Sequence, residues 1–130
     1  MSRPPAPPSP TVVLVVEDEG LVRMMATEML EEAGFVVLEA SDADEAMAIL
    51  AQRDDIGALF TDVDMPGSMD GFALAQRVAE MRPHVRLVIT SGRIRPSNED
   101  VPDSGQFVPK PYLMEQLLDA FASAGGQKHC

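Results

Sequence analysis

Short apolar runs alternate with amphipathic stretches along most of the chain. Residues 11–16, 35–40, 56–62, 85–91 and 107–108 form mostly apolar runs that predict five strands, the first of them β-branched and buried on both faces. Apolar residues recur at helical spacing in residues 21–30, 46–50, 72–81 and 113–121, which predict four regular helices. Ser41 is expected to be the N-cap of the second of these helices.

This order of elements predicts an α/β fold. Strands that alternate with helices form parallel sheets with right-handed crossovers and helices on both faces. Five strands favour a flavodoxin-like, doubly wound five-stranded parallel sheet in the order 2-1-3-4-5. The helical pattern fails between Gly92 and Gly105, so the helix expected there, fourth in chain order, should be short or degraded.

Composition divides the chain into one domain and two short ends. Residues 1–10 are rich in proline and predict a disordered leader, residues 11–124 form the domain, and residues 125–130 should fray. No apolar run reaches the length of a membrane span, and the N-terminus has no apolar segment typical of secretion. The single cysteine is Cys130, which fits a reducing compartment, so a cytoplasmic location is expected.

The net charge of −11 argues against direct nucleic acid binding, because such a surface repels phosphates. The acidic residues that follow strands are candidates for a functional site. The first strand ends in Glu17 and Asp18 and the third in Asp62, and these two strands flank the switch point of the predicted sheet. Acidic residues at a helix start can simply complement its dipole.

Three carboxylates in one place need a counter-charge. At an effective dielectric near 20, each like-charged pair at roughly 4 Å costs about 4 kcal/mol. Oxygen ligands favour a hard cation, and a site open to water and phosphate favours Mg²⁺ over Ca²⁺. The sequence therefore predicts a magnesium site that contains Glu17, Asp18 and Asp62.

The fourth and fifth strands add a hydroxyl and an amine to this edge of the sheet. Ser91 can donate a hydrogen bond, Gly92 offers an unobstructed backbone N–H, and Lys110 can place an ammonium against an anion. Taken singly, Ser91 and Lys110 would more often be a loop hydroxyl and a surface charge. Together with the metal site they form a set of groups suited to phosphoryl transfer, with Asp62 as nucleophile.

Four motifs lie in order along the chain: VVEDE at 15–19, TDVDMPG at 61–67 with Asp70-Gly71 after it, TSG at 90–92, and KP at 110–111. In their order and spacing they resemble the receiver domains of two-component response regulators, of the single-domain, CheY-like type. The resemblance covers about residues 11–124.

The resemblance implies that a sensor histidine kinase or a phosphotransfer protein donates a phosphoryl group to Asp62. It implies Mg²⁺ as cofactor, held directly by Asp18, through water by Glu17, and by the carbonyl of Asp64. It further implies no enzymatic activity beyond self-catalysed phosphorylation and slow dephosphorylation. The remaining implied roles are phosphoryl contact by Ser91, Lys110 and the backbone of Val63, Asp64 and Gly92, and switching by Ser91 and Phe107.

Departures from the family pattern leave alternatives open. The loop from Pro66 to Asp70 is one residue longer than the common pattern, and Thr90 competes with Ser91 for the hydroxyl role, although Ser91 is favoured because Gly92 follows it. A non-phosphorylated pseudo-receiver that acts as an interaction module is one alternative. A haloacid-dehalogenase-like phosphatase is another. A receiver could also carry a signal to a partner or serve as a phosphate sink.

Three expectations concern loops. The Lys110–Pro111 peptide bond is expected to be cis, which costs an X-Pro bond only about 0.5–1 kcal/mol, because a tight turn must aim Lys110 inward. Asp64 and Arg93 are expected to form a partial lid that slows hydrolysis of the acyl phosphate. Partners are expected to bind the first helix or the loops around Asp62, Ser91 and Lys110.

Overall fold

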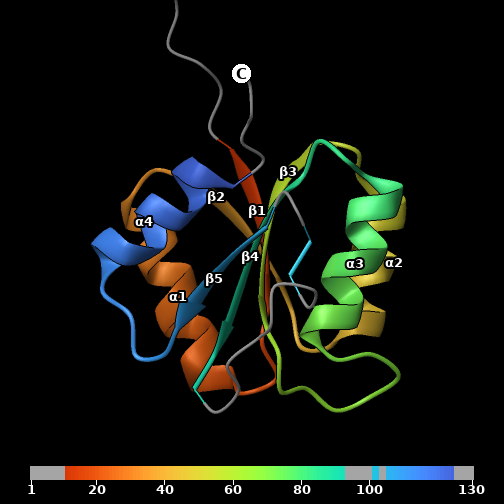
Figure 1. The fold of residues 1–130 in the computed structure, drawn as a ribbon, viewed down its shortest axis with the longest axis horizontal. Coiled ribbons are helices and arrows are strands. Elements are labelled where there is room, and N and C mark those ends of the chain that lie inside the picture. The colour runs from red at the N-terminus through yellow and green to blue at the C-terminus, as the bar shows by residue number, and fades with distance from the viewer. Residues whose placement is uncertain (1–10, 93–100, 103–104, 125–130) are drawn as a thin grey trace, which may run out of the picture.

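The computed structural model describes residues 11–92, 101–102 and 105–124, and it contains a five-stranded parallel sheet. Figure 1 shows this sheet at the centre of the molecule, between two layers of helices. The strand order β2-β1-β3-β4-β5 confirms the predicted flavodoxin-like order. The strands are β1 (Val12–Val16), β2 (Val36–Ala40), β3 (Ile56–Asp62), β4 (Arg86–Ser91) and β5 (Gly105–Pro109).

The central strand β1 shows why its sequence is continuously apolar. Successive side chains of a strand point to opposite faces, and both faces of β1 are covered. Val13 and Val15 belong to a core cluster with Leu117 of the last helix. Leu14 and Val16 belong to a second cluster on the other face. Each face of the sheet therefore has its own core.

In the described part of the chain, two helices cover each face of the sheet. Figure 1 shows α1 and α4 on one side and α2 and α3 on the other. Within the described ranges the helices are α1 (Gly20–Glu32), α2 (Ala43–Gln52), α3 (Gly71–Met81) and α4 (Met114–Ser123). These four correspond to the regular helices that the spacing of apolar residues predicts.

The predicted N-cap of α2 is wrong by one residue. Asp42, not Ser41, caps the helix, and its side chain accepts a hydrogen bond from the Glu45 N–H at 2.8 Å. Ser41 instead donates its backbone N–H and its hydroxyl to Glu45 Oε1, at 2.6 and 2.9 Å. Both residues before the helix therefore bond to Glu45, Asp42 to its backbone and Ser41 to its side chain.

The Lys110–Pro111 peptide bond is cis, which confirms that prediction. No helix in the described part of the chain is long and apolar enough to cross a membrane. Several other predictions fall outside the described residues: the leader at 1–10, the tail at 125–130, most of the segment of the degraded fourth helix, and the position of Arg93.

Candidate functional site

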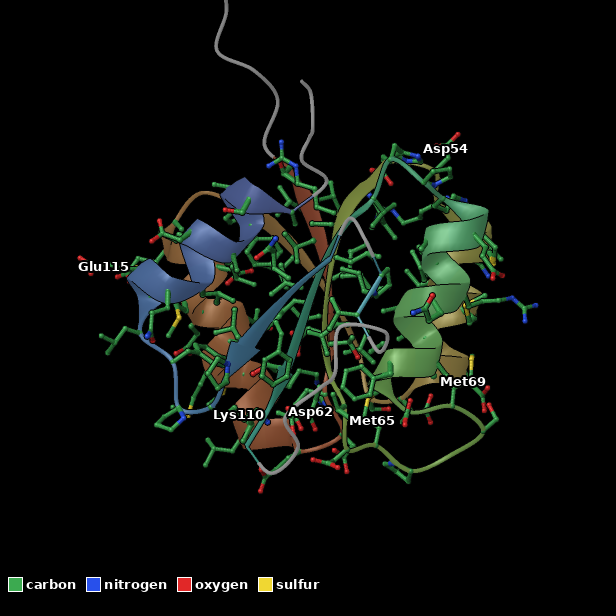
Figure 2. All side chains as sticks on the ribbon, viewed as in Figure 1. Asp54, Asp62, Met65, Met69, Lys110 and Glu115 are labelled. Carbon is green, nitrogen blue, oxygen red and sulfur yellow. The ribbon has the colours of Figure 1, made fainter. Side chains whose placement is uncertain are left out.

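Three carboxylates meet at the carboxyl edge of the sheet, as the sequence predicts. Glu17 and Asp18 follow β1, Asp62 ends β3, and one oxygen of each lies within 4.8 Å of the others. Glu17 and Asp62 are buried, whereas Asp18 is exposed. Figure 2 shows Asp62 and Lys110 together at this end of the sheet, with Asp54 at the opposite end. The strand order alone brings these side chains together.

Lys110 bridges two of the carboxylates. Its Nζ lies 3.1 Å from Glu17 Oε1 and 3.1 Å from Asp62 Oδ1. The contact with Glu17 is a hydrogen bond, whereas Asp62 Oδ1 is buried and accepts no hydrogen bond from the described residues. Lys110 thus forms an ion pair with Asp62 as well as with Glu17, so one ammonium serves two carboxylates.

Burial raises the pKa of Asp62, and the charges of Asp64 and Asp18 add to this effect while Lys110 opposes it. Burial also raises the pKa of Glu17, against hydrogen bonds from the Glu19 N–H and Lys110. The pKa of Lys110 is lowered by burial, but its contacts with Asp62 and Glu17 outweigh burial and leave it raised. The site therefore holds more negative charge than one lysine neutralises.

These shifts have a consequence for folding. An acid with a raised folded-state pKa binds its proton more tightly in the folded protein than in the unfolded chain. Stability contributed by Glu17 and Asp62 is therefore lost as pH rises past their ordinary values of 4.5 and 3.8. A bound cation would offset this loss, because it stabilises the ionised form.

The two candidate hydroxyls of β4 have different surroundings. The Thr90 hydroxyl is buried and donates to the carbonyl of Val108 at 2.6 Å, inside the sheet. The Ser91 hydroxyl lies on the site side, 3.3 Å from Asp64 Oδ2. Adjacent strand residues face opposite ways, so only one of the two can reach the carboxylates.

One backbone group expected to contact a phosphoryl group has another partner in this structure. The backbone N–H of Val63 donates to the carbonyl of Thr90 at 3.0 Å, as part of the pairing between β3 and β4. This N–H takes part in strand pairing here, and the expected contact of Val63 with a phosphoryl group stays a prediction. Gly92 lies at the rim beside Lys110, and Phe107 is half-buried against the cluster that contains Ile89.

Two residues near the site had no role assigned from sequence. Gly71 opens α3 so close to Asp62 that a Cβ atom there would lie 2.1 Å from the carbonyl oxygen of Asp62. Arg23 of α1 donates to the carbonyl of Glu17. Gly71 follows Asp70 at a helix start, which is a sequence signal for a close approach, whereas nothing local in the sequence marks Arg23.

An apolar groove adjoins the acidic pocket. The acidic pocket has a volume of about 390 Å³, and the groove of about 470 Å³ shares Gly92 and Lys110 with it. The groove runs between α1 and residues 110–112, which follow β5, and its lining residue Met25 is exposed. It is lined by Val22, Met25, Ala26, Met29, Gly92, Lys110, Pro111 and Tyr112.

The model of one protein family, the response regulator receiver domain, matches residues 13–122. The chain belongs to this family. Receiver domains are signalling domains of two-component systems, and they interact with histidine kinases or phosphotransfer proteins.

Relatives by sequence include the sensor kinase CckA of Brucella abortus, 32% identical over 109 residues, and the transcriptional regulatory protein PdtaR of Mycobacterium tuberculosis, 36% identical over 118 residues. These matches cover 81% and 88% of this chain. They cover only 11% of CckA and 57% of PdtaR, so the chain spans less than two thirds of either relative.

Solved structures share the fold. The receiver domain of the hybrid histidine kinase CckA is 33% identical, with a TM-score of 0.68 over 83% of this chain and 93% of that chain. The response regulator TrrA of Thermotoga maritima, solved in complex with Mg²⁺–BeF, is 22% identical, with a TM-score of 0.72 over 84% and 94% of the two chains.

Proposed function

We propose that this receiver domain accepts a phosphoryl group from a phosphohistidine onto Asp62, with Mg²⁺ as cofactor. One observation carries the proposal: Asp62 Oδ1 is buried without a hydrogen bond from the described residues, 3.1 Å from the ammonium of Lys110, beside Glu17 and Asp18. Three carboxylates beside a single ammonium leave negative charge that a bound cation would neutralise. A nucleophilic carboxylate beside a metal site accounts for this arrangement.

The reaction that fits this arrangement is a transfer between two residues. A carboxylate oxygen of Asp62 attacks phosphorus, the P–N bond of the donor histidine breaks, and its electron pair stays on the imidazole ring. Charge on the transferring phosphoryl oxygens then needs stabilisation. The ammonium of Lys110 lies where it could pair with one of these oxygens, and the hydroxyl of Ser91 could donate to another.

The residues present fit a magnesium ion. The donor set consists of carboxylate oxygens, which Mg²⁺ prefers, and no sulfur or imidazole ligand is among them. We propose that Asp18 and Asp62 hold the ion directly, Glu17 through water, and Asp64 with its carbonyl. When bound, Mg²⁺ would neutralise charge on the carboxylates and on the phosphoryl group.

This assignment predicts unequal effects of two variants. Asp18→Ala should weaken Mg²⁺ binding by at least about 10- to 100-fold, and Glu17→Ala by less, because contact through water contributes less than direct ligation. Titration calorimetry of the two variants and of Asp54→Asn, an exposed acid at the other end of the sheet, measures this. Equal losses in Asp18→Ala and Asp54→Asn would contradict the assignment.

We also propose that the phosphodonor docks over the apolar groove beside α1. The groove shares Lys110 with the acidic pocket, so a partner helix seated there would bring its histidine to Asp62. Met25, which lines the groove, is 57% exposed, so a partner could bury it on docking. The surface switch that follows phosphorylation would involve Ser91 and Phe107.

The function is tested with acetyl phosphate as a small-molecule phosphodonor. We expect Mg²⁺-dependent formation of one acyl phosphate, labile to hydroxylamine, which peptide mapping assigns to Asp62. Without Mg²⁺ the yield should fall to background. A chain that takes no phosphoryl group from acetyl phosphate or from any histidine phosphodonor, with the fold intact, would favour the pseudo-receiver alternative.

A further inference from the structure

An arginine of α1 ties the acidic loop after β1 to the neighbouring strand. Arg23 Nη1 donates to the carbonyl oxygen of Glu17 at 2.7 Å, and its Nε donates to Glu39 Oε1 at 3.1 Å. Glu39 lies on β2, next to the last residue of that strand. One guanidinium therefore connects a helix and the ends of two strands.

We propose that Arg23 is a positioning residue for the magnesium site, held in place by Glu39. The inference rests on the proposed function, since it assumes that Asp18 and Glu17 serve a metal ion. It concerns residues that touch neither the ion nor the phosphoryl group.

The hydrogen bond to the Glu17 carbonyl acts on Asp18 through the peptide plane. The carbonyl of Glu17 and the N–H and Cα of Asp18 belong to one planar unit, so fixing the oxygen fixes the orientation of that plane. The Asp18 side chain leaves from the Cα atom of this unit, so fixing the plane fixes the position from which the side chain starts, and φ and χ1 of Asp18 then set its direction. Asp18 is exposed and has no hydrogen bond that would orient it independently among the described contacts.

Other bonds hold the rest of the same loop. The backbone N–H of Arg23 donates to the Glu19 carbonyl at 2.9 Å, and the Glu19 N–H donates to Glu17 Oε2 at 3.2 Å.

The side chain of Arg23 is 24% exposed and that of Glu39 is 46% exposed. A planar guanidinium can serve two acceptors in fixed directions, which a single ammonium cannot.

The charge of Arg23 and its positioning role have opposite effects on Mg²⁺ affinity. A positive charge near a cation site opposes Mg²⁺ binding, so removing it should strengthen binding if charge were its main influence. Loss of positioning should weaken binding, because contacts that orient metal ligands typically change affinity by about 10- to 100-fold. The sign of the change therefore separates the two roles.

The experiment compares Arg23→Met with Arg77→Met, which removes an exposed arginine from α3. We expect a Mg²⁺ Kd about tenfold higher in Arg23→Met and unchanged in Arg77→Met. Calorimetry gives the Kd, since the chain has no tryptophan to report binding. The rise in Tm on adding Mg²⁺, measured for each variant against its own metal-free form, is a second readout that excludes a general loss of stability.

Two more variants test the role of Glu39. Glu39→Gln should weaken Mg²⁺ binding less than Arg23→Met, and the double variant should bind no more weakly than Arg23→Met alone, because Glu39 acts through Arg23. Arg23→Lys should give an intermediate Kd. Additive losses in the double variant, or a Kd in Arg23→Met that is unchanged or lower than in the wild type, would overturn the inference. Absence of Mg²⁺ binding in the wild type would instead overturn the proposed function.

Discussion

Asp62→Asn abolishes acyl-phosphate formation and leaves the fold intact: this is the largest effect that we expect. The amide has nearly the shape of the carboxylate but lacks the charge and nucleophilicity that attack on phosphorus requires. Lys110 and the neighbouring carboxylates would remain in this variant. The site would therefore keep groups that bind a phosphoryl group and a cation but would lack the nucleophile. The measurement is incorporation of label from a phosphohistidine donor or from acetyl phosphate at saturating Mg²⁺.

Two controls make this result specific. Asp54→Asn makes the same chemical change at an exposed acid on the opposite end of the sheet, and it should be labelled like the wild type. Circular dichroism and Tm of Asp62→Asn establish that the protein is folded. Labelling of the Asp62→Asn variant that survives acid treatment would place the accepting residue elsewhere.

Among glycine-to-alanine substitutions in the described part of the chain, Gly71→Ala should lower the free energy of unfolding most. A Cβ atom at Gly71 would lie 2.1 Å from the carbonyl oxygen of Asp62 and 2.8 Å from the Cα of Val63, which are backbone atoms and cannot change rotamer. Overpacking of this kind costs about 1–3 kcal/mol or more. We expect Tm to fall by roughly 5–10 °C, and phosphorylation to slow because relief of the clash displaces Asp62.

Gly20→Ala is the matched control for this prediction. Gly20 also begins a helix beside the acidic pocket, but the nearest atom to a Cβ there is Arg23 Nη2 at 3.9 Å, an ordinary contact. Alanine favours helix more than glycine does, so Gly20→Ala should leave Tm unchanged or raise it. A Gly71→Ala variant as stable as Gly20→Ala would show that α3 can move away from Asp62 at little cost.

Sequence patterns determined the sheet and the residues gathered at its edge. The apolar, β-branched run at β1 predicted a strand buried on both faces, and Val13 and Leu14 do lie in separate cores. Alternation of strands with helices limited the topology to a few arrangements. Once the order was assigned, Asp62 and Lys110 had to share one edge, because parallel strands all end on the same side.

The tertiary structure shows how two similar neighbours differ in their contacts. Thr90 and Ser91 are adjacent hydroxyls, and the pairing of β4 with β5 turns Thr90 towards the Val108 carbonyl. Ser41 and Asp42 are both good N-caps, and Asp42 is the one whose side chain accepts from the Glu45 N–H. In each pair the two residue types can make the same kind of hydrogen bond. Their positions relative to neighbouring strands and helices therefore determine which bond each one makes.

The tertiary structure also decided which backbone groups remain available and which side chains meet. Val63 carries an N–H beside the site, but the register of β3 against β4 commits it to the Thr90 carbonyl. Arg23 and Glu39 are 16 residues apart and lie on different elements, so no periodicity pairs them. Local sequence sets which conformations a segment favours. Contacts between segments depend on how strands and helices pack, and that packing is a property of the whole chain.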